Sequence, residues 1–140
     1  MWTYLIDTNV ISESTKENPD PNAMQWMSDV DPLICCLSVL TIAEIHRGIS
    51  ILEKKGATTK IRRVATWLER IEEDYTDRIL GISSSVARVW GYLPASHTLI
   101  DSLIAATAIA YNLTVVTRNT SDFLSTGAPT FNPFLIPSTR

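Results

Sequence analysis

YLIDTNVIS, residues 4–12, has the pattern of a buried strand that ends on an acid. Apolar residues lead up to Asp7, small polar residues follow it, and the apolar pattern resumes at Val10. An unpaired carboxylate that is removed from water costs several kcal/mol or more. We therefore expect other groups to compensate the charge of Asp7 at the point where this strand ends.

The composition is typical of one globular domain, spanning residues 1–140. A net charge of −3 argues against a protein that coats nucleic acid with a general basic surface. No basic leader precedes the first apolar stretch and no apolar run is long enough to span a membrane, so we expect a cytoplasmic protein. Cys35 and Cys36 are adjacent and too close to form a disulfide, which indicates two small apolar strand residues.

Strand-like and helix-like segments alternate along the chain, which predicts a parallel sheet with helices on both faces. The expected strands are residues 2–7, 33–38, 78–83 and 114–119, with a short last strand at TFN, residues 130–132. The expected helices are a turn from Asn9, residues 23–30 capped by Asn22, residues 41–54 and 59–74, a helix opened by Ser84, and residues 98–112. The fold class is therefore α/β: three α/β/α layers around a mostly parallel sheet of four to five strands.

Four acidic residues occupy places where a solvated charge is not expected. Asp7 ends the first strand, Glu44 lies between isoleucines near a helix start, Asp101 interrupts the most apolar helix, and Asp122 follows the fourth strand. Ligands of open parallel sheets bind outside the carboxyl ends of the strands. We expect the four carboxylates to converge there around a divalent cation, Mg²⁺ or alternatively Mn²⁺.

Each acid also has an ordinary structural interpretation as a cap, turn or ion-pair residue. Asp7 could be a helix cap, and Asp122 could be a turn residue. Glu44 could interact with the helix dipole or pair with Arg47 or Arg118. Asp101 could form a cap together with Thr98 or Ser102. All four acids together at these positions favour the metal site.

Four segments resemble the PIN-domain family, in the same order and over nearly the whole chain. They are DTNVIS after a strand, LTIAEIHRGI, LIDSLIAATAIAYNLTVVTRNTSDF and the closing FNPF. The resemblance is closest to the VapC-like and FitB-like toxins of bacterial toxin–antitoxin pairs. It implies a Mg²⁺-dependent ribonuclease whose catalytic and metal-binding acids are Asp7, Glu44, Asp101 and Asp122. Thr8, Asn9, Thr117 and Asn119 match supporting positions.

Two details differ among members of the family. Some have an aspartate directly after TR, where this chain has Asn119, and we expect Asp122 to be the fourth acid with Asn119 as a polar neighbour. The approach to the helix of Asp101 reads PASHTLID, where many relatives have a glycine and a small polar residue, so the loop that borders the pocket is not predicted.

The expected chemistry is hydrolysis of an RNA phosphodiester by metal-activated water. Asp7 and Asp101 contact the metal directly, while Glu44 and Asp122 bind it through water or act on the attacking water. Arg47 and Arg118 are the candidate substrate-binding residues. Lys60, Arg62 and Arg63 either reach phosphates as well or form a salt-bridged surface.

The resemblance also implies partners. These are a small cognate antitoxin that presents an arginine to the acidic pocket, operator DNA bound only through that antitoxin, and a second copy in a homodimer. Trp26, Trp67 and Trp90 offer apolar area for the dimer, although such tryptophans are more often core residues.

Two rival interpretations share the raw features. A phosphoacceptor receiver module also places acids at strand ends, but it carries an adjacent pair of acids after the first strand and a lysine after the last. Here Asp7 stands between Ile6 and Thr8, and the late strand ends in Thr117 and Arg118. A catalytically silent PIN-like module that acts through protein partners is the second rival, and the presence of all four acids disfavours it.

Overall fold

The computed structural model describes residues 1–95 and 98–135, so Ser96 and His97 of PASHTLID lie outside the described residues. In this part of the chain five strands form one sheet in the order β3-β2-β1-β4-β5, and every pair is parallel. The strands are β1 (Tyr4–Ile6), β2 (Cys35–Ser38), β3 (Ile79–Leu80), β4 (Thr114–Val116) and β5 (Thr130–Phe131). The predicted fold class is confirmed.

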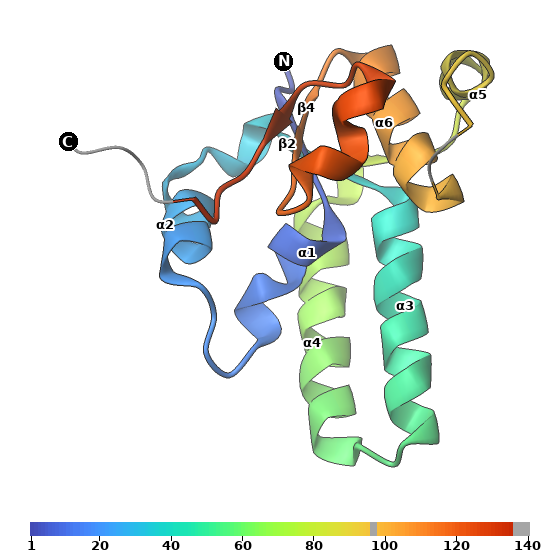
Figure 1. Cartoon of the computed structure of the whole chain (residues 1–140). Coiled ribbons are helices and arrows are strands. Elements are labelled where there is room, and N and C mark those ends of the chain that lie inside the picture. Colours follow the sequence, from blue (N-terminus) through green and yellow to red (C-terminus); the bar gives the residue numbers. More distant parts are fainter. Residues whose placement is uncertain (96–97, 136–140) are drawn as a thin grey trace.

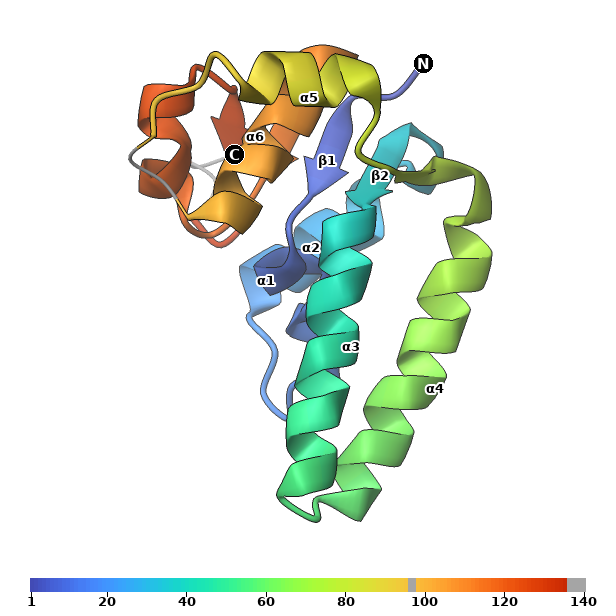
Figure 2. The same cartoon turned by 90° about the vertical axis from the view of Figure 1, so that its right-hand side faces the viewer.

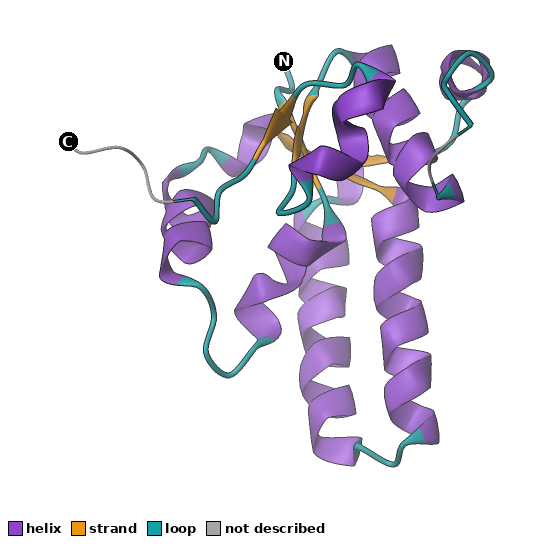
Figure 3. Ribbon diagram, viewed as in Figure 1, coloured by secondary structure: helices purple, strands orange, loops and turns teal. Residues whose placement is uncertain are grey.

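Helices follow or precede nearly every strand. They are α1 (Thr8–Ile11), α2 (Pro21–Asp29), α3 (Val39–Lys54), α4 (Thr58–Asp74), α5 (Ser84–Trp90) and α6 (Leu99–Tyr111), with short 3₁₀ segments η1 (Ser12–Thr15), η2 (Pro32–Ile34), η3 (Thr76–Arg78) and η4 (Thr120–Thr126). α3 and α4 form a long antiparallel hairpin (Figure 1). The strands gather at one end of this hairpin, so its other end extends away from the sheet (Figure 3). Figure 2 shows the same hairpin from the side.

The sheet separates two apolar cores because successive strand residues point to opposite faces. Leu5, Cys36 and Val115 belong to one core, which α6 and η4 complete with Ile104 and Phe123. The strand residues adjacent to these in the sequence, Ile6, Cys35 and Val116, belong to the other core. Helices α1, α3 and α4 complete that core with Val10, Ile42, Ile45 and Leu68. This alternation confirms that helices cover both faces of the sheet.

Both cysteines are buried and free, as expected of small apolar strand residues. Burial raises the pKa of the Cys35 thiol to about 11 and that of the Cys36 thiol to about 12. Both thiols therefore stay protonated at neutral pH.

Several predicted boundaries are wrong: the strands expected at residues 2–7, 78–83 and 114–119 are shorter in the structure, and two further errors have a local cause. Asn22 does not cap the second helix, because α2 already begins at Pro21 and the carboxylate of Asp20 accepts from the Ala23 N–H at 2.9 Å. Aspartate is a strong N-cap and proline suits the first helical position, which together outweigh the asparagine. The expected strand 33–38 begins only at Cys35, since the Asp31 carboxylate accepts from the Leu33 N–H at 3.0 Å and starts a 3₁₀ turn.

Within the described residues, no helix combines the length and apolar character needed to cross a membrane.

Candidate functional site

Asp7 lies at the carboxyl end of the central strand and is only 7% exposed. Its Oδ1 accepts from the Thr8 N–H at 2.9 Å, so it caps α1 as the structural alternative suggested. Its Oδ2 accepts from the Thr117 hydroxyl at 2.9 Å and from Asn9 Nδ2 at 3.3 Å. The cap therefore uses one oxygen, while the other belongs to a polar cluster between α1 and the end of β4.

Thr117 and Asn9 fix this cluster. Thr117 is fully buried, and its hydroxyl oxygen also accepts from Asn9 Nδ2 at 3.2 Å and from the Asn119 N–H at 3.1 Å. The Oδ1 of Asn9 accepts from the Arg118 N–H at 3.0 Å. The register that pairs Ile6 with Val116 places the residues after these two strands side by side. The four residues that the resemblance named as supporting thus all bond to Asp7 or to one of its immediate neighbours.

Glu44 reaches the same place from the other side of α1. It is half-buried on α3, and its Oε1 accepts from the Thr8 hydroxyl at 2.5 Å. The ion pairs among the described residues do not include Glu44, so the alternative pairing with Arg47 or Arg118 is not found there. Thr8 therefore links the two acids, with its N–H on Asp7 and its hydroxyl on Glu44.

Asp101 lies in the first turn of α6, where its N–H donates to the capping Thr98 hydroxyl at 3.3 Å. Its carboxylate is close enough to act on Asp7. The pKa of Asp7 is raised to about 6: burial raises it most, hydrogen bonds from Thr117 and Thr8 partly offset this, and the negative charges of Glu44 and Asp101 raise it further. Folding thus gathers three of the four predicted acids into one region of negative charge.

Asp122 differs from the other three acids. It is exposed in the first turn of η4, and its N–H donates to the Asn119 carbonyl at 3.0 Å, which fits the turn interpretation. The negative charges that raise the Asp7 pKa belong to Glu44 and Asp101 rather than to Asp122. Its role as the fourth acid stays a prediction.

The raised pKa of Asp7 predicts a pH-dependent stability. The carboxyl has a pKa near 3.8 when unfolded and about 6 when folded, so the folded state prefers the protonated form. The free energy of unfolding should fall by about 2 kcal/mol as the pH rises from 4 to 7 without divalent cations, at about 1.4 kcal/mol per pKa unit. Urea titrations across this range test the effect against Asp7→Asn, which should remove most of this component. A difference between the two proteins that does not change with pH would contradict the assignment.

Thr117→Val should make Asp7 harder to ionise. The substitution keeps the side-chain shape but removes the hydroxyl that donates to Asp7 Oδ2, a hydrogen bond that lowers the pKa of this carboxyl. We expect the pKa of Asp7, followed by carboxyl-carbon NMR, to rise above its wild-type value, with a loss of about 1–3 kcal/mol in stability from the unsatisfied partners. Thr66→Val, on the exposed surface of α4, is the control. An unchanged or lowered Asp7 pKa in Thr117→Val would contradict the role of this hydroxyl.

The predicted substrate-binding arginines do not contact the acids. The guanidinium of Arg118 lies over the Phe134 ring, 3.8 Å from its centroid, and Arg47 is exposed on α3. The ion pairs found among the described residues are Lys16–Glu13 and His46–Glu72. Lys60, Arg62 and Arg63 therefore do not form the salt-bridged surface that was one of the two alternatives.

One buried acid was missed by sequence reasoning. Glu13 is 2% exposed, its Oε2 accepts from the Asp20 N–H at 2.7 Å, and its Oε1 lies 3.0 Å from Lys16 Nζ. It closes the loop between η1 and α2. The surrounding SESTKE is polar and gives no signal of burial, so nothing in the sequence distinguished Glu13 from a solvated residue.

The protein is therefore a three-layer α/β protein with a parallel sheet, and its acids gather at the carboxyl end of the central strand. Within this class, the sequence pattern of the PIN domain matches residues 4–128. Toxin FitB of Neisseria gonorrhoeae is 31% identical over 141 aligned residues, which cover 93% of this chain and 97% of that toxin. The chain belongs to the PIN domain family.

Other comparisons agree with this membership. VapC ribonuclease Y4jK of Sinorhizobium fredii is 30% identical, with 93% of this chain and 96% of that protein covered. The crystal structure of FitAcB from Neisseria gonorrhoeae superposes with a TM-score of 0.86 at 30% identity, covering 96% of this chain and 100% of that one. A toxin–antitoxin complex from Klebsiella pneumoniae gives a TM-score of 0.68 at 26% identity, with 96% and 100% coverage.

Proposed function

We propose that this protein is a Mg²⁺-dependent endoribonuclease that hydrolyses RNA phosphodiester bonds and serves as the toxin of a toxin–antitoxin pair in the cytoplasm. The observation that carries the proposal is the buried Asp7 at the carboxyl end of the central strand, with the charges of Glu44 and Asp101 acting on it. The names of two relatives, a toxin and a VapC ribonuclease, support it.

The donor set fits a hard divalent cation. Asp7, Glu44 and Asp101 offer carboxylate oxygens, which Mg²⁺ and Mn²⁺ prefer. A cation there would also offset the burial and the weaker charge repulsion that raise the Asp7 pKa. Across the described part of the chain, no three His, Cys, Asp or Glu side chains are close enough to hold a metal by themselves. We therefore expect small side-chain movements of Glu44 and Asp101 when the ion binds.

The residues of the chain have separate tasks in this proposal. When bound, Mg²⁺ would neutralise charge on the phosphodiester and lower the pKa of the water molecule that attacks it. Asp7 and Asp101 hold the ion, and the Thr117 hydroxyl and the Asn9 amide orient Asp7 through its Oδ2. Glu44, oriented by the Thr8 hydroxyl, accepts the proton of the attacking water, with Asp122 as a second acid near the same edge.

A small cognate antitoxin is the proposed protein partner, with operator DNA bound only through that antitoxin and with a homodimer as the assembly. The solved structure described as a toxin–antitoxin complex supports the antitoxin. Three carboxylates near one sheet edge also provide a site for an arginine side chain, since arginine pairs strongly with carboxylates.

Cleavage of RNA by the purified protein tests the proposed function. A labelled RNA should be cut with Mg²⁺ or Mn²⁺ and left intact with EDTA, because the acids alone cannot neutralise the phosphodiester. Single-stranded DNA of the same sequence serves as the comparison substrate. Cleavage that persists in EDTA would contradict the metal dependence. A protein that binds its antitoxin but cuts no RNA under any metal condition would favour the catalytically silent module.

A further inference from the structure

Residues 47–70, which form the part of the α3–α4 hairpin far from the sheet, are rich in positive charge, whereas the whole hairpin has seven basic and six acidic residues. Seven of the twelve lysines and arginines lie between residues 47 and 70, with only two of the fifteen acidic residues. The segment thus has five surplus positive charges in a protein whose net charge is −3. A charge separation of this size attracts anionic ligands to one side of a molecule.

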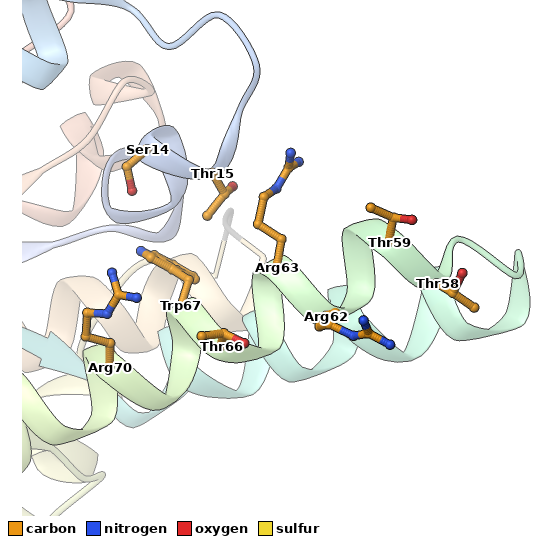
Figure 4. Close-up of a pocket in the computed structure, with 9 residues that line it drawn as sticks. All are labelled: Ser14, Thr15, Thr58, Thr59, Arg62, Arg63, Thr66, Trp67 and Arg70. Carbon is orange, nitrogen blue, oxygen red and sulfur yellow. The ribbon is translucent and has the colours of Figure 1, made fainter.

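A groove of about 520 Å³ runs along this hairpin, between α4 and the η1 turn. Its walls include Arg62, Arg63, Trp67 and Arg70 on α4, with Thr15 on η1. Trp67 stands between Arg63 and Arg70, and all three side chains project from α4 toward the turn of η1 (Figure 4). We call this feature the arginine groove.

The guanidinium groups of the groove form no ion pair with an acid of the described residues. The ion pairs among residues 1–95 and 98–135 are Lys16–Glu13 and His46–Glu72, which leave Arg62, Arg63 and Arg70 exposed and unneutralised. Trp67 is half-buried, packed against the core and also lining the groove. Unpaired guanidinium groups beside an indole can bind a ligand that has both negative charge and flat rings.

A second hollow lies beside the arginine groove and reaches one of the acids. It has a volume of about 310 Å³ and is lined by Thr8 and Glu44 of the acidic site as well as by Thr15 and Trp67, which also line the arginine groove. The two spaces therefore share a wall. A flexible chain that lies in the arginine groove would have to cross Thr15 and Trp67 to reach Glu44.

We propose that the arginine groove binds single-stranded RNA on one side of the phosphodiester that is cut, with Arg63 and Arg70 on phosphates and Trp67 against a base. This inference rests on the proposed function and names where its substrate lies. Positive grooves that offer an aromatic ring for base stacking are typical of single-strand binding. A duplex keeps its bases stacked on one another, so the indole requires an unpaired strand.

The test measures binding of fluorescent oligouridylate to the full-length protein in EDTA, where the proposed metal chemistry is absent. Arg63→Gln with Arg70→Gln should weaken binding about tenfold or more and reduce the salt dependence of log K by about 0.7 for each phosphate that the variant no longer binds. Lys54→Gln with Lys55→Gln is the matched control, because it removes two charges from the same hairpin outside the groove. It should change binding about twofold or less.

A third variant tests the aromatic contact. Trp67→Leu keeps an apolar side chain against the core but removes the ring, and it should weaken binding about fivefold or more because the base can no longer stack. Circular dichroism checks that its helices are retained. If the fold is lost, the arginine variant and its control still decide the inference.

Three outcomes would overturn it. The first is unchanged RNA binding by the double arginine variant, and the second is an equal loss of RNA binding in the lysine control. The third is a double arginine variant that loses antitoxin binding but keeps RNA binding, which would make the groove a protein-docking surface. The proposed function is judged separately, by Mg²⁺-dependent cleavage with the wild-type protein. Cleavage without groove-dependent binding refutes only this inference, whereas groove-dependent binding without cleavage refutes only the nuclease.

Discussion

Replacing Asp7 with asparagine should reduce RNA cleavage by more than about 100-fold, since even residues that only orient a metal ligand are worth about 10–100-fold. Asparagine has nearly the same shape and keeps an oxygen for the Thr8 N–H, so the cap of α1 survives. It lacks the negative charge that holds a divalent cation. Activity should therefore fall far more than stability.

Initial cleavage rates with excess Mg²⁺, together with Mg²⁺ titration by calorimetry, measure this effect. Asp29→Asn is the matched control, because Asp29 is exposed on α2 and accepts from the Gln25 side chain at 3.0 Å. It should retain near wild-type rates. Full Mg²⁺-dependent cleavage by the Asp7→Asn protein would remove Asp7 from the mechanism.

Phe123→Ala should be among the most destabilising single substitutions, with a loss of about 3–5 kcal/mol in the free energy of unfolding. Phe123 is fully buried in the core that α6 and η4 form on the sheet, where Leu5 and Ile104 also lie. Removing the ring leaves a cavity that the surrounding strands and helix cannot fill. The same ring anchors η4, which carries Asp122.

The neighbouring residue provides the control for this experiment. Leu124 is 75% exposed, so Leu124→Ala should change stability by about 0.5 kcal/mol or less. Urea denaturation at one pH, with the slopes compared as well as the midpoints, measures both variants. Similar losses in the two proteins would mean that Phe123 is not a core residue.

Local patterns in the sequence predicted most of the fold. The apolar spacing of residues 41–54 and 59–74 placed two helices within two residues of α3 and α4. The error at Asn22 has a local cause, since an equally good cap, Asp20, and a proline suited to the first helical position stand just before it. Strand ends were harder to predict, because a strand's length depends on its neighbours in the sheet, and the edge strand β3 pairs over only Ile79 and Leu80.

The site was predictable where topology dictates it. Asp7 and Thr117 directly follow adjacent parallel strands, so any fold that pairs β1 with β4 brings them together. Asp122 lies further along the chain, in a 3₁₀ segment whose course the sequence does not determine. The arginine groove depends on how η1 packs beside α4, a contact between distant segments. Periodicity along a single helix carries no information about such a contact.

The central position of β1 has a consequence for how the protein is made. β1 is synthesised before the other four strands, yet one of its two neighbours is β4, residues Thr114–Val116, which is the fourth strand along the chain. Pairing of strands so distant along the chain must wait until β4 has been synthesised. Thr117 can therefore hold Asp7 only after β4 and the residue that follows it have left the ribosome, and any activity of this centre has to wait for that segment.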